Sequence, residues 1–293
     1  MSRCLALAPL VLIARGVARL PQGVLVALSG ALSVLLSPLL ARRRRIAAIN
    51  LALCFPALPE RNRRQLLWAN QRATVMGVFE LLRAWYAPSS ALAGLARIEG
   101  LPILQAALAT GRGVLLFTGH FTHTELAVRL LSEALGRPLC GVVRRNNSAC
   151  VEATFAAARA GVFGTTLGKK DVRGLLRTLQ VGEAVVYSAD QNFSYQHAFV
   201  PFFGVSAATL ITTPDLVRHG RAQMLPFWFH RDADGGYCLR IESTWPGWVE
   251  ANGEQAAAIY MRELEAVVRR HPEQYLWIHK RFKTRAPGDP SVY

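Results

Sequence analysis

The stretch GVLLFTGHFTHTELAVRLL, residues 113–131, changes from a strand-like to a helix-like pattern within a few positions. Its first part, GVLLF, is a short continuous apolar run of the kind that forms a buried strand. In its second part apolar residues recur at helical spacing as far as Gly136, which predicts the end of a helix. A strand followed directly by a helix is the repeating unit of α/β folds, so this stretch indicates the fold class.

The same alternation continues downstream. Strands are predicted in PLCGVVRR (138–145), EAVVYSAD (183–190), AQMLPFWFHR (222–231), YCLRIES (237–243) and QYLWIHKRF (274–282). Helices are predicted in CVEATFAAARA (150–160), KKDVRGLLRTLQVG (169–182) and EQAAAIYMRELEAVVRRHP (254–272). The expected fold is therefore α/β, with a mostly parallel or mixed central sheet flanked by helices.

The first 45 residues differ from the remainder. Residues 23–41 contain no charged side chain, and four arginines follow at 42–45. Nineteen residues of helix would span about 28 Å, close to the thickness of a hydrocarbon core. We therefore expect residues 1–45 to form a membrane anchor with a basic flank, and the positive-inside rule puts residues 46–293 on the cytoplasmic side. A helix lying in the interface, or buried in the domain, is the alternative.

Residues 46–95 are expected to be a helical lead-in to the α/β domain, because apolar residues recur at helical spacing between 61 and 86. The net charge of the chain is +15, which indicates anionic partners. The five cysteines are scattered with no CxxC spacing, so they are expected to be reduced packing residues.

Three interpretations of the turn GHFTHTELA, residues 119–127, compete. Thr122 and Glu125 have the spacing of a helix capping box, in which case Glu125 only binds the backbone. His120, His123 and Glu125 could together bind zinc, although HFTH is not the HExxH pattern. Finally, His120 could act as a general base whose ring Glu125 orients, one helical turn further on. Such a pair needs no protein nucleophile, and the sequence contains neither a GxSxG elbow nor a P-loop.

Five short sequence motifs, taken in their order along the chain, resemble those of a known family. They are NLALCFP, GHFTHTEL, GVVRRNN, ADQNFS with FVPFFG, and QYLWIHKRFKTR. The second block contains the HX4(D/E) motif of glycerolipid acyltransferases, and together the blocks resemble the late acyltransferases of lipid A biosynthesis. The resemblance runs from about residue 50 to the C-terminus.

The resemblance implies transfer of an acyl chain from acyl carrier protein to a hydroxyl of a lipid A precursor at the bacterial inner membrane. The acyl chain would arrive on the phosphopantetheine of the carrier protein, and the enzyme would need no cofactor or metal of its own. His120 would be the base and Glu125 its partner. Arg144, Asp190, Arg281 and Lys283 match substrate-binding positions of the family. His123 matches none, and we expect it to be exposed at the start of the helix.

Two other functions fit parts of the sequence. An acyltransferase of the same fold could use another acceptor, such as a lysophospholipid or a glycolipid. A membrane-anchored nucleic-acid-binding protein could use the basic segments for phosphates and Trp277 or Phe282 for stacking. The second function has no use for a histidine and a carboxylate at a strand end, and we do not expect nucleic acid as a partner.

Overall fold

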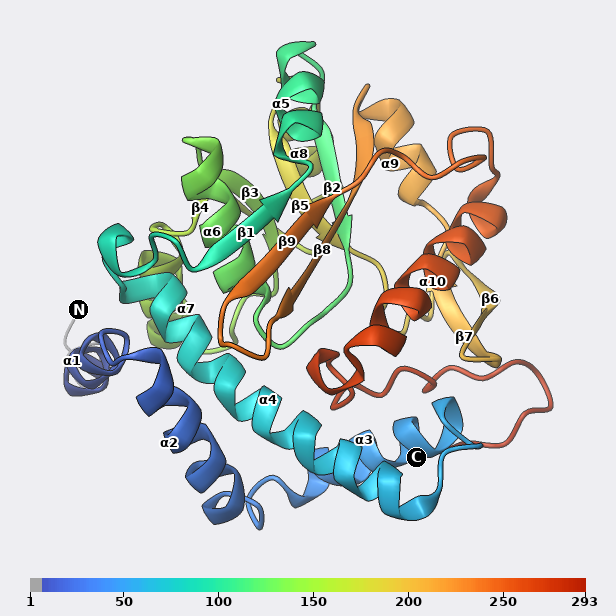
Figure 1. Ribbon diagram of the computed structural model, residues 1–293. Helices are drawn as coiled ribbons and strands as arrows, with labels where there is room; N and C mark the ends of the chain where they lie inside the picture. Colours follow the sequence, from blue (N-terminus) through green and yellow to red (C-terminus); the bar gives the residue numbers. More distant parts are fainter. Residues whose placement is uncertain (1–6) are drawn as a thin grey trace.

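The computed structural model describes residues 7–293 (Figure 1). The helices are α1 (Ala8–Val17), α2 (Gln22–Leu35), α3 (Ala41–Cys54), α4 (Glu60–Tyr86), α5 (Leu101–Ala109), α6 (Thr124–Leu135), α7 (Ala149–Arg159), α8 (Val172–Gln180), α9 (Thr213–His219) and α10 (Gly253–Arg270). The strands are β1 (Ala96–Glu99), β2 (Val114–Thr118), β3 (Leu139–Val143), β4 (Phe163–Gly168), β5 (Ala184–Ser188), β6 (His197–Phe202), β7 (Val205–Leu210), β8 (Gln223–Arg231) and β9 (Tyr237–Ile241). Short 3-10 helices lie at Ser89–Ala91 (η2) and Pro272–Gln274 (η3).

Seven strands form the central sheet in the order β1-β9-β8-β2-β5-β3-β4. Every neighbouring pair is parallel except β8 and β9, which form an antiparallel hairpin. The strands β2, β5, β3, β4 and β8 therefore end at the same edge of the sheet. This arrangement confirms the predicted α/β class with a mostly parallel sheet flanked by helices.

The strand-to-helix stretch forms as predicted. All five residues of β2 are buried, as expected for a central parallel strand. The helix α6 ends at Leu135, directly before Gly136. The helix α10 is held at its start by a capping box between Asn252 and Gln255, and its Tyr260 ring stacks on Phe117 with ring centroids 4.0 Å apart.

Some expected elements differ. Residues 274–282 were predicted as a strand, but Gln274 ends η3 and residues 275–282 run as irregular chain, with an isolated bridge between Tyr275 and Phe121. The aromatic side chains of Tyr275, Trp277 and Phe282 are buried without strand neighbours on both sides. The antiparallel pair β6 and β7, which packs against α10 (Figure 1), was not predicted, and neither were β1, β4, α5 and α9.

The predicted membrane-spanning helix is wrong. The helix α2 ends at Leu35, residues 36–40 form a turn that contains Pro38, and α3 begins at Ala41. Proline lacks the N–H that a continuing helix requires, so the apolar run is divided in two. Fourteen residues of α2 span about 21 Å, which is shorter than a hydrocarbon core of about 30 Å. In residues 7–293 no helix is both long and apolar enough to cross a bilayer.

The N-terminal helices form a layer against one end of the sheet. In Figure 1 the long α4 runs diagonally past the lower ends of the strands, with α2 and α3 beside it. The boundary expected at residue 45 falls inside α3, whose buried side includes Ile46 and Leu51. Within residues 46–95, α3 continues to Cys54 and α4 begins at Glu60 after Pro59 and ends at Tyr86.

Candidate active site

His120 and Asp190 lie side by side because of the register between two parallel strands. Thr118 of β2 pairs with Ser188 of β5, and both chains leave the sheet in the same direction. Two residues further along each chain are His120 and Asp190. The hydroxyl of Tyr260 on α10 joins the two strand ends, since it donates to Thr118 O at 2.8 Å and accepts from the backbone N–H of Ala189 at 3.4 Å.

The Asp190 carboxylate binds His120 directly. Its Oδ1 lies 2.6 Å from Nδ1 of the imidazole, and its Oδ2 accepts from the backbone N–H of His120 at 2.9 Å. The hydroxyl of Tyr275 also donates to Oδ2, at 2.9 Å. Asp190 is buried, whereas the side chain of His120 is 36% exposed. With Nδ1 bound to the carboxylate, Nε2 is the ring nitrogen left to accept a proton.

The pair raises the basicity of His120. Burial by itself lowers the pKa of the imidazole, but the charge of Asp190 and the hydrogen bond to it raise that pKa, and the net direction is upward. For the carboxyl of Asp190 burial has the opposite effect and raises the pKa, but His120 and Tyr275 lower this pKa to about 2. Asp190 is therefore ionised at neutral pH and stabilises a protonated His120.

Glu125 has other partners than the predicted one. Its Oε2 accepts from Nε1 of Trp85 at 2.5 Å, and its Oε1 pairs with the guanidinium of Arg159 at 3.0 Å. The side chain thus joins α6 to α4 and α7. The predicted contact between Glu125 and the ring of His120 is wrong. Glu125 is the second residue of α6, and its side chain points to α4 and α7. Nδ1 of His120 is bound by Asp190 instead.

The capping-box interpretation is also wrong. The residue that precedes α6 is His123, not Thr122, and no side chain caps the helix. His123 is buried, contrary to the expectation that it is exposed, and its ring packs edge-on against Phe229 with centroids 5.2 Å apart. Burial lowers the pKa of His123 to about 3. Because His120, His123 and Glu125 each have separate partners, they do not converge on a common metal position.

The remaining predicted residues are dispersed. Arg144 follows β3 at the same edge of the sheet and is exposed, as is Lys283. Arg281 is buried instead: it donates to Ala208 O at 2.7 Å and to the hydroxyl of Thr209. Arg281 therefore does not lie on the surface as Lys283 does, although it borders a cavity of about 10 Å³ beside His120 and Asp190. That volume holds about one water molecule.

Sequence reasoning missed two of the contacts at this site. Tyr275 was included in a predicted strand, and no local pattern indicated that its hydroxyl would reach Asp190. Arg159 falls in a predicted helix, and its position near the end of that helix gives no indication that it pairs with Glu125. The rings of Trp277 and Phe282 are buried, so they are not available to stack on nucleic-acid bases.

An α/β sheet that holds a histidine–carboxylate pair at its carboxyl edge is suited to an enzyme that removes a proton from a hydroxyl group. The sequence profile of bacterial lipid A biosynthesis acyltransferases matches residues 6–284, and the chain belongs to this family. It is an acyltransferase.

Individual relatives agree with this assignment. The chain is 35% identical over 278 residues to the lipid A biosynthesis palmitoleoyltransferase of Escherichia coli K12, covering 94% of this chain and 90% of the relative. It is 33% identical over 280 residues to the lauroyltransferase of the same organism, covering 94% and 91%. Identity to the myristoyltransferase is 24% over 262 residues, covering 85% and 78%. Membership of this family supports acyl transfer in lipid A synthesis.

Proposed function

We propose that this acyltransferase moves a fatty acyl chain from the thioester of acyl carrier protein to a hydroxyl of a lipid A precursor, with His120 as general base. The observation that carries the proposal is the contact between Nδ1 of His120 and the buried carboxylate of Asp190, at 2.6 Å. A base held in this way presents Nε2 to the exposed side of the strand end. Asp190 replaces Glu125 as the orienting partner in this mechanism.

The reaction needs one proton acceptor that later becomes a donor. Nε2 of His120 takes the proton of the acceptor hydroxyl while the oxygen attacks the thioester carbonyl. The tetrahedral intermediate collapses, the carbon–sulfur bond breaks, and the imidazolium returns its proton to the leaving thiolate. Asp190 stabilises the imidazolium throughout. No acyl group is attached to the protein, and no cofactor is needed beyond the phosphopantetheine of the carrier.

Cations near the carboxyl edge suit anionic substrates. Arg144, Arg145 and Lys169 lie where β3 and β4 end, and they make no ion pair within residues 7–293. We assign Arg144 to the phosphates of the acceptor or to the acidic surface of the carrier protein. Lys283 is exposed on the C-terminal segment and adds to the same positive charge.

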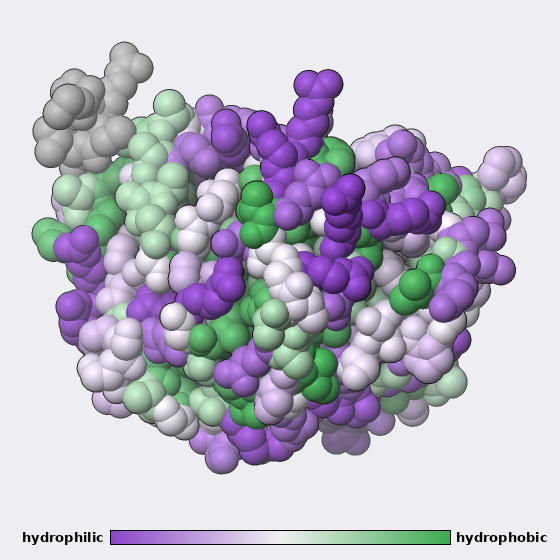
Figure 2. Space-filling model, turned by 90° about the horizontal axis from the view of Figure 1, so that it is seen from above, coloured by the Kyte–Doolittle hydropathy of each residue, from purple (hydrophilic) through white to green (hydrophobic). Residues whose placement is uncertain are grey.

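The N-terminal helices carry an apolar surface that we propose lies in the membrane interface. Among residues 7–293, nine of the fifteen exposed large hydrophobic side chains lie between positions 10 and 39: Leu10, Leu12, Ile13, Val24, Val26, Leu28, Val34, Leu35 and Leu39. Figure 2 shows hydrophobic surface on the left-hand side, where these helices lie in Figure 1. Such a concentration marks an interaction surface.

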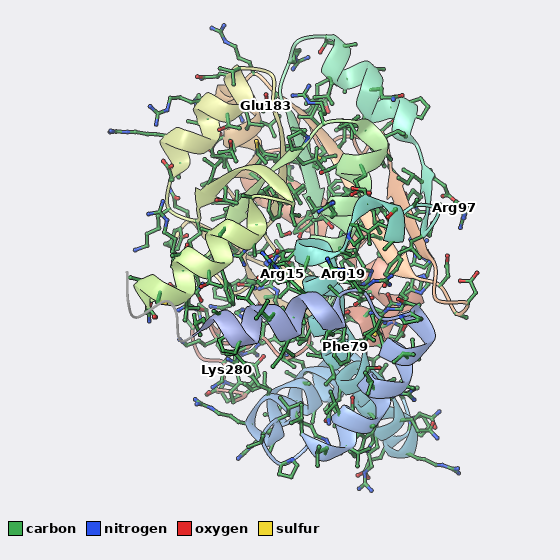
Figure 3. The ribbon with its side chains drawn as sticks, turned by 90° about the vertical axis from the view of Figure 1, so that its left-hand side faces the viewer. Arg15, Arg19, Phe79, Arg97, Glu183 and Lys280 are labelled. Carbon is green, nitrogen blue, oxygen red and sulfur yellow. The ribbon has the colours of Figure 1, made fainter. Side chains whose placement is uncertain are left out.

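The helix α2 carries apolar side chains on its outer side as well as on its buried side. Leu25, Ser29 and Ser33 are buried, and Gln71 of α4 donates to Ser33 O at 2.6 Å, whereas Leu28 and Leu35 are exposed. Arginines flank this surface: Arg15 lies in the last turn of α1 and Arg19 follows the end of that helix (Figure 3), and Arg42–Arg45 follow Ala41 at the start of α3. Apolar side chains with flanking arginines fit the boundary of an anionic bilayer, with the catalytic edge on its cytoplasmic face.

The test is transfer by the purified enzyme, followed by mass spectrometry of the acceptor lipid. Wild-type protein is mixed with acyl carrier protein bearing a fatty acyl thioester and with a lipid A precursor. His120→Ala should lower kcat by about 10²–10⁴-fold with an unchanged melting temperature. His219→Ala, at the exposed last residue of α9, is the matched control. Full activity of His120→Ala would refute the mechanism, and use of acyl-coenzyme A alone would refute the donor.

A further inference from the structure

The segment Glu273–His279 links the N-terminal helices to the candidate active site. On one side it binds the turn after β2: Leu276 N donates to His120 O at 3.0 Å, and Thr122 N donates to Gln274 O at 2.9 Å. The Tyr275 side chain, from the middle of this segment, donates to Asp190. The position of this segment therefore sets the positions of both His120 and Asp190.

Two buried asparagines hold the other side of the segment. Nδ2 of Asn70, on α4, donates to Glu273 O and to Tyr275 O, each at 2.8 Å. Nδ2 of Asn50, on α3, donates to Trp277 O at 2.7 Å and to His279 O at 2.8 Å. Four alternate carbonyls of one irregular segment are thus bound by two side-chain amides.

The contact between α4 and the catalytic turn is equally close. A Cβ atom on Gly77 would lie 2.3 Å from the backbone oxygen of Thr122, so only glycine permits this approach. Gln274 holds the segment to the sheet as well, because its amide exchanges two hydrogen bonds with the backbone of Arg231. An irregular segment has no strand ladder of its own, so these amides supply the order that a ladder would provide.

We propose that Asn50 and Asn70 are positioning residues for the acyl transfer reaction. They act through the Glu273–His279 segment, which fixes the carbonyl of His120 and directs the Tyr275 hydroxyl to Asp190. Neither asparagine touches a reacting atom. The inference rests on the proposed role of His120, and it adds that the N-terminal helical layer determines the geometry of the catalytic pair.

The consequence for chemistry is specific. When the segment loosens, the His120 ring moves away from Asp190, whose charge raises the pKa of the imidazole. The pKa of His120 then falls toward its ordinary value of about 6.5. Small displacements of a catalytic group cost about 10²-fold in rate, while substrate binding, which uses other surfaces, is retained.

The experiment compares Asn70→Ala with Gln71→Ala in the full-length enzyme. Gln71 is the neighbouring buried amide of α4, but it holds Ser33 of α2 instead of the catalytic segment. Both variants should lose melting temperature. Only Asn70→Ala should lower kcat, by about 10–100-fold. Its KM for both substrates should stay within about twofold of the wild-type value. The ascending limb of its pH–rate profile should move to lower pH. Equal kinetic behaviour of the two variants would overturn the proposal.

Two further measurements complete the test. Asn50→Ala affects the same segment from α3, so it serves if Asn70→Ala does not fold, and it should produce the same separation of kcat from KM. An NMR titration of His120 requires no substrate. A lowered pKa of His120 in the asparagine variants supports the positioning role even if the proposed donor or acceptor is wrong, and an unchanged pKa contradicts it.

Discussion

Asp190 binds His120 twice, through the backbone N–H at 2.9 Å and through Nδ1 of the ring at 2.6 Å. The first contact fixes the turn after β2, and the second fixes the orientation of the imidazole. The same carboxylate therefore determines where the base lies and which ring nitrogen is available. This double contact distinguishes Asp190 from Glu125, whose oxygens are bound to Trp85 and Arg159.

The pH dependence of activity should separate these two carboxylates. Because Asp190 raises the pKa of His120, the neutral base forms only above about pH 6.5, and kcat/KM should rise through that raised pKa. Asp190→Asn should lower kcat by about 10²–10⁴-fold and move the ascending limb to lower pH. Glu125→Gln should leave the position of that limb unchanged, whatever it does to the rate. A shift in Glu125→Gln equal to that in Asp190→Asn would restore the predicted histidine–glutamate pair.

A buried ion pair should dominate the stability of the joint between α4 and β8. Glu80 is fully buried and binds the guanidinium of Arg231 through both oxygens, at 2.7 and 2.6 Å. Arg231→Met leaves the carboxylate uncompensated and should lower the free energy of unfolding by about 3–5 kcal/mol in urea denaturation. Glu183→Gln is the control, since its pair with Arg137 is exposed (Figure 3 labels Glu183) and should contribute less than about 1 kcal/mol. Equal losses would show that burial is not the deciding factor.

His123 should make the protein sensitive to acid. Burial lowers its pKa to about 3, although the charge of Glu80 acts in the opposite direction. An unfolded histidine takes up a proton near pH 6.5, so the unfolded state binds more protons below that pH and the free energy of unfolding falls as the pH decreases toward 3. His123→Phe keeps a ring against Phe229 and removes this titration. Its melting temperature should therefore decline less between pH 7 and pH 5 than that of the wild type; parallel curves would count against this explanation.

Binding to vesicles should depend on the outward face of α2. Leu28→Glu combined with Leu35→Glu puts two charges at exposed apolar positions. The double variant should lose most of its co-sedimentation with vesicles containing phosphatidylglycerol and keep its melting temperature. Val181→Glu combined with Val249→Glu changes two exposed apolar residues outside the N-terminal helices, and it should bind as the wild type does. Retained binding by the α2 variant would exclude this surface as the membrane contact.

Much of the fold follows from local patterns. The apolar run 114–118 and the helical spacing after it predicted β2 and α6, and the same reasoning found β3, β5, β8, β9 and α10. These elements depend on periodicity and on neighbouring residues, which one sequence contains. The family resemblance likewise rested on short ordered blocks, and the profile match confirmed it.

The partner of His120 was decided by tertiary structure. Glu125 is close in sequence, but its side chain leaves α6 toward α4 and α7, whereas Asp190 arrives from 70 positions away because β2 and β5 pair in register. Asn50, Asn70 and Tyr275 reach the site only because helices pack around an irregular segment. Hydrophobic periodicity specifies which face of an element is buried, but the choice of neighbour depends on how all the elements pack together, and no local pattern encodes that choice.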